Sequence, residues 1–139
     1  KIAEEIQKND EASYNFLSEV DIPGRYYGDG VELLAKRPVF RQNKQKEIIQ
    51  VSFNNYDRAD FRLPNDQISN FYSSIRTFDK IANDKSMQWR KILEPGQLLI
   101  FDNWRILHGR SEFSGKRRMS GCYINKEDFE SACRMYNIN

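Results

Sequence analysis

Short segments of alternating apolar and polar residues restrict the folds open to this chain. In the clearest one, Glu47–Phe53, the residues Ile49, Val51 and Phe53 share one face, which is typical of a half-buried strand. Further strands are predicted within Val31–Phe40 and, in the second half of the chain, at 98–101, 105–107 and 117–124. Few helices separate these segments, so we expect antiparallel pairing. The pattern therefore predicts an α+β fold with a mainly β core, arranged as a sandwich, barrel or jelly roll.

Three helical regions are expected beside the strands. Residues 1–20 should form one or two short helices, which Pro23-Gly24 bring to an end. Asn65 is expected to cap a helix that runs to about Ala82, because apolar residues recur along one face at Ile68, Phe71, Tyr72, Ile75 and Phe78. Asn125 is expected to cap a final helix, whose apolar face carries Phe129, Ala132, Cys133 and Tyr136.

The composition excludes several kinds of partner. The 139 residues suffice for one domain, and the net charge of +2 gives no bulk attraction to nucleic acid or anionic lipid. The longest apolar run, Leu98–Phe101, is far shorter than the ~20 residues that a membrane-spanning helix needs. We therefore expect neither a nucleic-acid nor a membrane partner. Two cysteines without a disulfide framework favour an intracellular protein, with mitochondria and cytoplasm left open.

His108 is the single histidine of the chain. It follows the apolar residues Ile106 and Leu107 and precedes Gly109. A histidine at the end of a core strand can ligate a metal through a neutral ring nitrogen. Its position alone nevertheless favours the ordinary interpretation, a histidine that is hydrogen-bonded at a strand end.

Arg117, Tyr123 and Asn54 are candidate ligand-binding residues. In a strand over 117–124, Arg117 and Tyr123 would share one face, and a guanidinium there could hold a carboxylate with two parallel hydrogen bonds. Asn54 ends the strand Glu47–Phe53, where its amide could bond a ligand carboxylate. Each residue also has an ordinary interpretation, which is favoured without other information. Arg117 would end a solvated basic loop, Tyr123 would be half-buried, and Asn54 would form a turn.

Several stretches in a fixed order resemble one known family. The longest is Phe101–Arg110, FDNWRILHGR, and it is continued by Phe113, Gly115, Arg117 and Gly121-Cys122-Tyr123. Upstream stand Phe53–Ala59, FNNYDRA, and the Pro95-Gly96 turn. Together they resemble the C-terminal part of the γ-butyrobetaine and trimethyllysine dioxygenases, a family of Fe(II)- and 2-oxoglutarate-dependent hydroxylases of the carnitine pathway. The resemblance covers most of residues 1–139.

The resemblance implies a fold and a site. The fold would be the C-terminal portion of a double-stranded β-helix, or jelly roll, with flanking helices. The iron of the family is held by two histidines and one carboxylate, and His108 matches the second histidine. Arg117 matches the arginine that holds the distal carboxylate of 2-oxoglutarate. Tyr123 matches an aromatic residue that lines the trimethylammonium pocket, and Asn54 matches an asparagine near the polar end of the substrate.

The resemblance also implies a reaction. It is the hydroxylation of N6,N6,N6-trimethyllysine to its 3-hydroxy form, the first step of carnitine biosynthesis, with 2-oxoglutarate converted to succinate and carbon dioxide. Ascorbate would be the reductant, and a homodimer is compatible with the family. The short loop between His108 and Arg117 and the Gly-Cys-Tyr ending favour trimethyllysine over γ-butyrobetaine as the substrate.

The chain departs from the family in one respect. The family's first iron ligands form a His-x-Asp motif, but no histidine precedes His108 in this sequence. Lys1 lies inside the first expected helix with no capping residue before it. We therefore expect residues 1–139 to be the C-terminal part of a single 2-oxoglutarate dioxygenase catalytic domain, without its upstream part. Two alternatives remain: an inactive relative, and a non-catalytic binding fragment that contacts phosphates through Lys116–Arg118.

Overall fold

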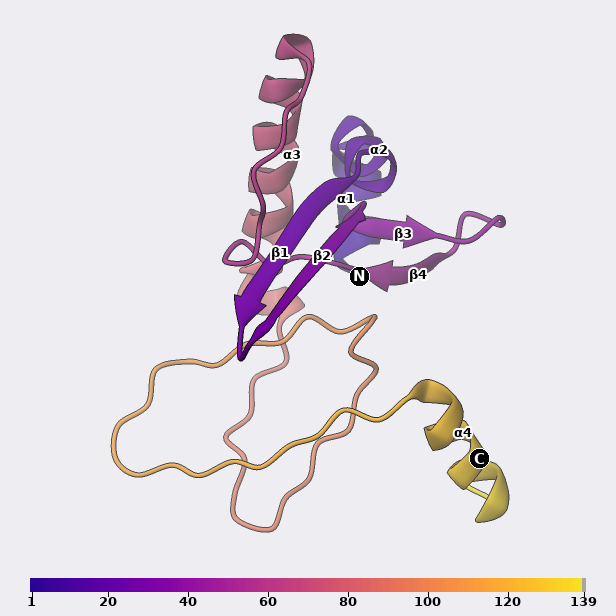
Figure 1. Ribbon diagram of the computed structural model, residues 1–139, viewed down its shortest axis with the longest axis vertical. Helices are drawn as coiled ribbons and strands as arrows, with labels where there is room; N and C mark the ends of the chain where they lie inside the picture. The colour runs from indigo at the N-terminus through magenta and orange to yellow at the C-terminus, as the bar shows by residue number, and fades with distance from the viewer. Residues whose placement is uncertain (139) are drawn as a thin grey trace. The chain divides into compact units, whose positions relative to one another are not determined.

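The computed structural model describes residues 1–138. They form two units, Lys1–His108 and the residues from Gly109 onward, each of which is described by itself. The first unit contains α1 (Ile2–Asn9), α2 (Glu11–Glu19), β1 (Ile22–Gly28), β2 (Val31–Arg37), β3 (Phe40–Gln42), β4 (Ile48–Val51), α3 (Asn65–Ala82) and a 3-10 helix (Lys85–Met87). Figure 1 labels the α-helices and the strands. The second unit contains α4 (Lys126–Met135).

The first two helices confirm the prediction for residues 1–20. Asp10 joins them: its backbone N–H donates to the carbonyl of Ile6 at the end of α1, and its side chain accepts from the N–H of Ser13 in the first turn of α2. A single aspartate thus ends one helix and caps the next, which holds the two helices at a sharp corner.

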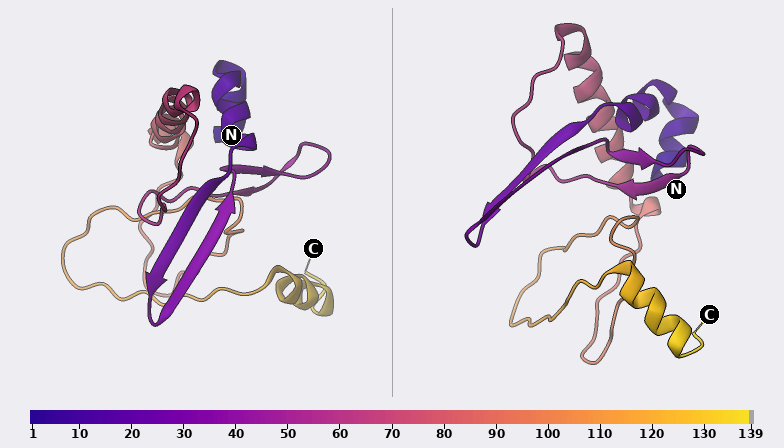
Figure 2. Two further views of the ribbon diagram at one scale, coloured as in Figure 1. Left: turned by 45° about the horizontal axis from the view of Figure 1, so that its top comes forward. Right: turned by 45° about the vertical axis from the view of Figure 1, so that its right-hand side comes forward.

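Strands β1 and β2 form an antiparallel hairpin that extends away from the helices of its unit (Figure 2). Its two-residue loop is Asp29-Gly30, with φ of 53° and 78°, as a type I′ turn requires. The helical region ends before Pro23-Gly24, as expected, but the strand that begins at Ile22 was not expected. The carbonyl of Pro23 accepts from Ala59 on the side away from β2. The proline ring nitrogen faces the same way, so its missing N–H removes no hydrogen bond of the hairpin.

Strands β3 and β4 form a second, shorter hairpin with a bulge between Arg41 and Gln42. The loop is closed by Asn43, whose side-chain oxygen accepts from the N–H groups of Gln45 and Glu47 at 3.0 and 2.9 Å. The strand expected over Glu47–Phe53 is confirmed in shorter form.

Helix α3 confirms the amphipathic helix expected over 65–82. Its N-cap position is held by Pro64 rather than Asn65, and no side chain caps it. The prediction of Asn65 as the cap is therefore wrong by one residue, because proline already directs the chain into the first turn. Phe71, Ile75 and Phe78 are buried, whereas two other members of the expected stripe, Ile68 and Tyr72, are exposed.

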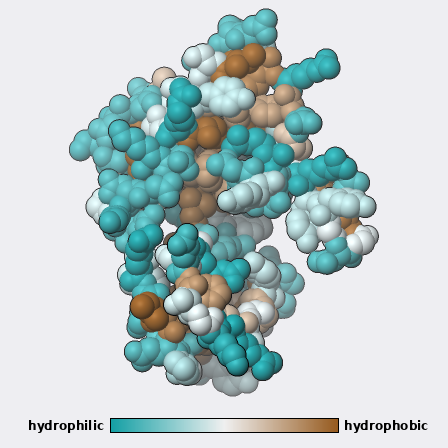
Figure 3. All heavy atoms as spheres, turned by 90° about the vertical axis from the view of Figure 1, so that its left-hand side faces the viewer, coloured by the Kyte–Doolittle hydropathy of each residue, from teal (hydrophilic) through white to brown (hydrophobic). Residues whose placement is uncertain are grey.

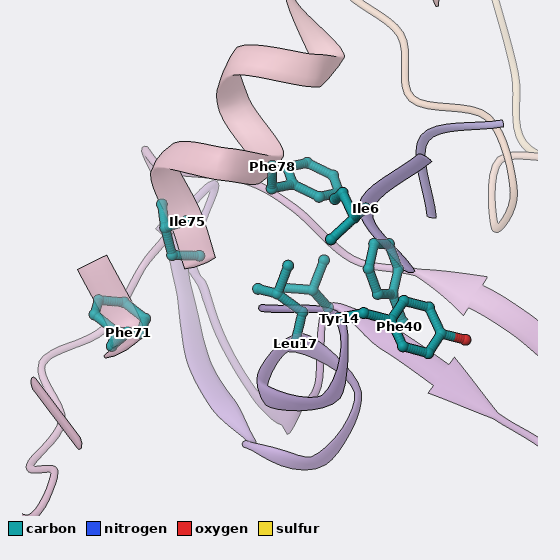
Figure 4. Close-up of a cluster of buried hydrophobic side chains, with 8 residues drawn as sticks. Ile6, Tyr14, Leu17, Phe40, Phe71, Ile75 and Phe78 are labelled. Atoms are coloured by element: carbon teal, nitrogen blue, oxygen red, sulfur yellow. The ribbon is translucent and has the colours of Figure 1, made fainter. Parts of the chain in front are cut away.

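The core of the first unit is built mostly from helical residues. Its buried members are Ile6, Tyr14, Leu17, Val39, Phe40, Phe71, Ile75 and Phe78. Phe78 of α3 points toward Ile6 of α1, and Tyr14 of α2 lies beside Phe40 of β3 (Figure 4). The ring centroids of Phe40 and Phe78 are 5.7 Å apart, within the range of favourable aromatic pairs. The hairpins and helices therefore share one small core, which is not mainly β.

The strands expected at 98–101, 105–107 and 117–124 do not form within the described residues. A strand needs the backbone of a neighbour, and alternation of side chains cannot supply one. Hydrophobic residues accordingly reach the surface, and some are visible on the face drawn in Figure 3. The fold is α+β with two short antiparallel sheets, and over residues 1–138 these sheets do not close into a jelly roll.

Helix α4 of the second unit confirms the expected final helix. Asn125 occupies its N-cap position without a side-chain cap to the backbone, and its amide Nδ2 lies 3.4 Å from Asp128 Oδ2. The expected apolar face is exposed at Phe129 and Tyr136. Within residues 1–138, no helix combines the length and the apolar content that crossing a membrane would demand.

Candidate functional site

His108 is positioned by a segment that lies against the edge of β4. The N–H of Val51 donates to the carbonyl of Trp104 at 2.7 Å, and Arg105 Nη1 donates to the carbonyl of Ile48 at 2.6 Å. Asp102 builds the turn before this segment, because its Oδ1 accepts from the N–H of Trp104 at 2.9 Å. The segment therefore approaches β4 closely but makes too few hydrogen bonds to form a strand.

The imidazole of His108 is exposed, although Leu107 before it packs against the core. Its ring lies 4.9 Å from that of Phe101, tilted by 55°. Nδ1 lies 3.4 Å from the carbonyl oxygen of Ile106. A neutral imidazole in this position donates from Nδ1 and presents the lone pair of Nε2. This is the tautomer that a metal-binding histidine needs when its other nitrogen is held by the backbone.

The described residues do not by themselves form an iron site. Among residues 1–138, no three histidine, cysteine, aspartate or glutamate side chains come together in a group that could hold a metal ion. His108 could supply one ligand of a two-histidine, one-carboxylate site, but no such group is completed within residues 1–138.

Asn54 lies in a loop that is tied to β1. Its side-chain Nδ2 donates to Asp57 Oδ2 at 2.5 Å, and its Oδ1 accepts from the N–H of Tyr56 at 2.9 Å. The carbonyl of Asp57 accepts from the N–H of Arg25 at 2.7 Å. A Cβ on Gly24 would lie 3.3 Å from that carbonyl oxygen, so glycine permits the close approach. Asn54 therefore acts as a turn former here, with part of its amide engaged locally.

Asn54 and His108 both lie a few residues from one backbone hydrogen bond. That bond joins Val51 to Trp104, and Asn54 follows Val51 by three residues while His108 follows Trp104 by four. Each of the two residues is thus a short stretch of chain away from this hydrogen bond.

Arg117 belongs to the second unit and is exposed. Its guanidinium carbon lies 5.3 Å from the centroid of the Phe113 ring, within cation–π distance. Its Nε donates to Met119 Sδ at 3.1 Å, and its Nη2 donates to the same sulfur. Arg117 is therefore held by two neighbours. The expected strand that would place Arg117 and Tyr123 on one face is not formed.

Tyr123 is 84% exposed, and its ring is open to a ligand from solvent. Lys116 and Arg118 are exposed as well. Arg117 and Tyr123 lie in the second unit, and His108 and Asn54 lie in the first.

Among the residues that contact the predicted site residues, Phe101, Phe113 and Met119 were not assigned roles from the sequence. Phe101 packs beside His108, and Phe113 and Met119 contact Arg117. The signal for Met119 was its place two residues after Arg117, on the same side of the expected strand. Phe101 and Phe113 stand within the stretches that carry the family resemblance, but no spacing or alternation points to a role for either of them.

The sequence matches the family model described as Taurine catabolism dioxygenase TauD, TfdA family, over residues 1–123. All of the predicted site residues fall within the matched range: Asn54, His108, Arg117 and Tyr123.

Curated relatives are similar over nearly the whole chain. The trimethyllysine dioxygenase of Meyerozyma guilliermondii is 37% identical over 142 aligned positions, which cover 98% of this chain and 35% of the relative. The trimethyllysine dioxygenase of Neurospora crassa is 39% identical over 137 positions, or 95% of this chain and 29% of the relative. A gamma-butyrobetaine dioxygenase of a Pseudomonas species is 29% identical over 133 positions, or 94% of this chain and 35% of the relative. The chain thus spans about a third of the length of the curated relatives that it matches.

Proposed function

Because this chain belongs to the TauD/TfdA dioxygenase family, we propose that it forms the C-terminal part of the catalytic domain of an Fe(II)- and 2-oxoglutarate-dependent dioxygenase. An upstream part of the same domain would carry the His-x-Asp ligands. The observation that carries the proposal is the family similarity over residues 1–123, which includes every predicted site residue. In the complete domain, the segments 98–107 and 117–124 would find partner strands and join a jelly roll.

Within this domain, His108 would be an iron ligand through Nε2, in line with the contact of its Nδ1 to the carbonyl of Ile106. Arg117 would hold the distal carboxylate of 2-oxoglutarate in a charge-assisted, two-point hydrogen bond. When bound, iron and 2-oxoglutarate together supply the oxidising chemistry, and ascorbate would keep the iron reduced. The part of this chain is to position these groups.

The proposed substrate is N6,N6,N6-trimethyllysine, hydroxylated at carbon 3. Relatives named trimethyllysine dioxygenase are 37% and 39% identical to this chain, and they support this choice. A quaternary ammonium cannot donate a hydrogen bond, so an aromatic face is the natural means of holding it. Tyr123 offers such a face, and Asn54 would contact the polar end of the substrate through the part of its amide that the turn leaves available.

The first experiment tests the iron ligand in the enzyme that contains this chain and its upstream part. His108→Ala should abolish stoichiometric iron binding, because one of three protein ligands is removed. Arg110→Ala, an exposed neighbour, is the matched control and should keep its iron. Unchanged iron content and turnover in His108→Ala would refute the assignment.

The second experiment tests the co-substrate clamp. Arg117→Ala should raise the KM for 2-oxoglutarate far more than the KM for trimethyllysine. The reason is that the guanidinium is proposed to bind the distal carboxylate of 2-oxoglutarate and no group of trimethyllysine. Arg118→Ala, the exposed neighbour, should leave both values near those of the wild type. Equal increases in both KM values for Arg117→Ala would count against the clamp.

γ-Butyrobetaine is the second candidate substrate, because a gamma-butyrobetaine dioxygenase is 29% identical over 94% of this chain. The kcat/KM of the complete enzyme for each compound decides between them. A higher value for γ-butyrobetaine would replace trimethyllysine as the substrate and leave the iron and 2-oxoglutarate roles intact.

A further inference from the structure

The side chain of Arg117 is held by two neighbours whose contacts differ in kind. The guanidinium carbon lies over the Phe113 ring, 5.3 Å from the ring centroid. At one edge lies the sulfur of Met119, which accepts from Nε at 3.1 Å and also from Nη2. The ring attracts the positive charge through a cation–π contact, and the sulfur opposes rotation of the guanidinium within its plane.

The edge that the sulfur occupies decides where an anion can bind. A guanidinium offers a carboxylate two flat edges, one formed by Nε and Nη2 and the other by Nη1 and Nη2. Met119 takes the first of these edges. The second keeps two parallel N–H groups, which match the two oxygens of a carboxylate.

We propose that Met119 and Phe113 are positioning residues that hold Arg117 so that its Nη1–Nη2 edge binds the distal carboxylate of 2-oxoglutarate. This inference rests on the proposed function, because it deepens the role given there to Arg117. The thioether suits the task, since it is a weak acceptor that orients the guanidinium without neutralising it. A carboxylate in its place would compete directly with the ligand for the positive charge.

Replacing Met119 should weaken the binding of 2-oxoglutarate but not that of trimethyllysine. Met119→Leu keeps a similar volume and removes the acceptor sulfur, so the guanidinium gains freedom to rotate. We expect 2-oxoglutarate to bind about three- to fivefold more weakly, with a matching increase in its KM. The kcat and the KM for trimethyllysine should stay unchanged. Phe113→Leu removes the ring face and should weaken 2-oxoglutarate binding to a similar extent.

The experiment uses the complete enzyme and measures binding by calorimetric titration without oxygen, so the readout is independent of turnover. The probes are 2-oxoglutarate and 2-oxopentanoate, which has the same number of carbons but a methyl group in place of the distal carboxylate. Met119→Leu should weaken the binding of 2-oxoglutarate and leave that of 2-oxopentanoate unchanged. Met135→Leu, an exposed methionine of α4, is the matched control and should alter neither. Thermal unfolding of each variant separates a loss of binding from a loss of fold.

A double-mutant cycle with Arg117→Lys tests whether Met119 acts through Arg117. Lysine lacks the planar fork, so Met119→Leu should have no additional effect in that background. If Arg117→Lys weakens 2-oxoglutarate binding while Met119→Leu and Phe113→Leu do not, the positioning role is overturned and the clamp stands. If Arg117→Lys itself leaves 2-oxoglutarate binding unchanged, both the clamp and the positioning role are overturned. If Met119→Leu weakens the binding of 2-oxoglutarate and 2-oxopentanoate equally, the positioning role is also overturned.

Discussion

Asp10 is the residue whose replacement tests the fold most sharply. Its Oδ1 accepts from the N–H of Ser13 at 3.0 Å, and its Oδ2 accepts from the Ser13 hydroxyl at 2.6 Å and the Thr77 hydroxyl at 3.2 Å. The last bond joins the α1–α2 corner to α3, 67 residues away in sequence. One carboxylate therefore caps a helix and ties the corner to α3, which carries three of the eight buried hydrophobic residues of the core.

The cost of Asp10→Ala can be built from these contacts. Loss of an N-cap costs about 0.5–2 kcal/mol. The hydroxyls of Ser13 and Thr77 also lose an acceptor, and Ser13 is 4% exposed, so water cannot readily replace it. With about 0.5–1.5 kcal/mol for a net hydrogen bond, we expect Asp10→Ala to lower the free energy of unfolding by about 2–3 kcal/mol. Asp10→Asn keeps a neutral acceptor and should cost about 1 kcal/mol.

The pH dependence follows from the pKa of Asp10. The Ser13 hydroxyl, then the Ser13 N–H and the Thr77 hydroxyl, donate to the carboxylate and hold its pKa below the ordinary value of 3.8, against the opposing effect of partial burial. The unfolded chain therefore binds this proton more readily than the folded chain does, so stability rises with pH across the interval between the two values. The contribution is complete above the ordinary value and is lost as the pH falls through the lower, folded value.

Urea unfolding followed by circular dichroism measures both effects. The difference in free energy of unfolding between wild type and Asp10→Asn should be largest at neutral pH and should shrink as the pH falls below 3.8. Asp21→Asn, an exposed carboxylate after α2, is the control. If Asp10→Ala costs no more than Asp21→Ala, or if the difference for Asp10→Asn is the same at every pH, then the capping argument is wrong.

Three further predictions concern the core, one turn and the proposed substrate contact. Phe78→Ala should lower the free energy of unfolding by about 3–5 kcal/mol because Phe78 is 0% exposed, whereas Arg76→Ala on the exposed side of α3 should change it by about 0.5 kcal/mol or less in urea unfolding. Gly30→Ala should lower the free energy of unfolding by about 1–2 kcal/mol, because alanine is strained at a φ of 78°. Nothing lies within 4 Å of the added Cβ, so the cost comes from the backbone alone, and a loss no greater than that of Gly109→Ala would contradict this. Tyr123→Leu should raise the KM for trimethyllysine about three- to fivefold, and Tyr123→Phe should raise it much less. The KM for 2-oxoglutarate should stay constant in both variants. Equal effects of the two variants on the KM for trimethyllysine would refute the cation–π contact.

Local patterns predicted the elements whose cause is local. The helix over Asn65–Ala82 and the two helices within residues 1–20 follow from apolar spacing, and β4 follows from alternation. Strand β1 was missed because Pro23-Gly24 was taken as a stop. The stronger signal was Asp29-Gly30, a dipeptide that favours a two-residue hairpin turn. The Asp29-Gly30 turn, and not Pro23, therefore determines that residues 22–37 form a hairpin.

The strands of the second half could not be predicted correctly from alternation. Arg117–Ile124 alternates as a strand would, but pairing depends on a neighbouring backbone that is distant in sequence. The same limit applies to the site. Motifs identified His108 and Arg117, and the family match over residues 1–123 confirms the resemblance on which they rest. The contacts of Arg117 with Phe113 and Met119 depend on how a loop folds back, which no periodicity encodes.

The exposed run Leu98–Phe101 affects how this chain behaves in concentrated solution. Leu98 is 82% exposed and Ile100 66%, and four adjacent apolar residues with unpaired backbone can add to the same run of another molecule. Aggregating segments are usually about 5–7 uncharged residues long. Asp102 ends this run with a negative charge, and so limits the length over which two copies could stack. We therefore expect that the aspartate that shapes the turn before His108 also limits aggregation of this chain.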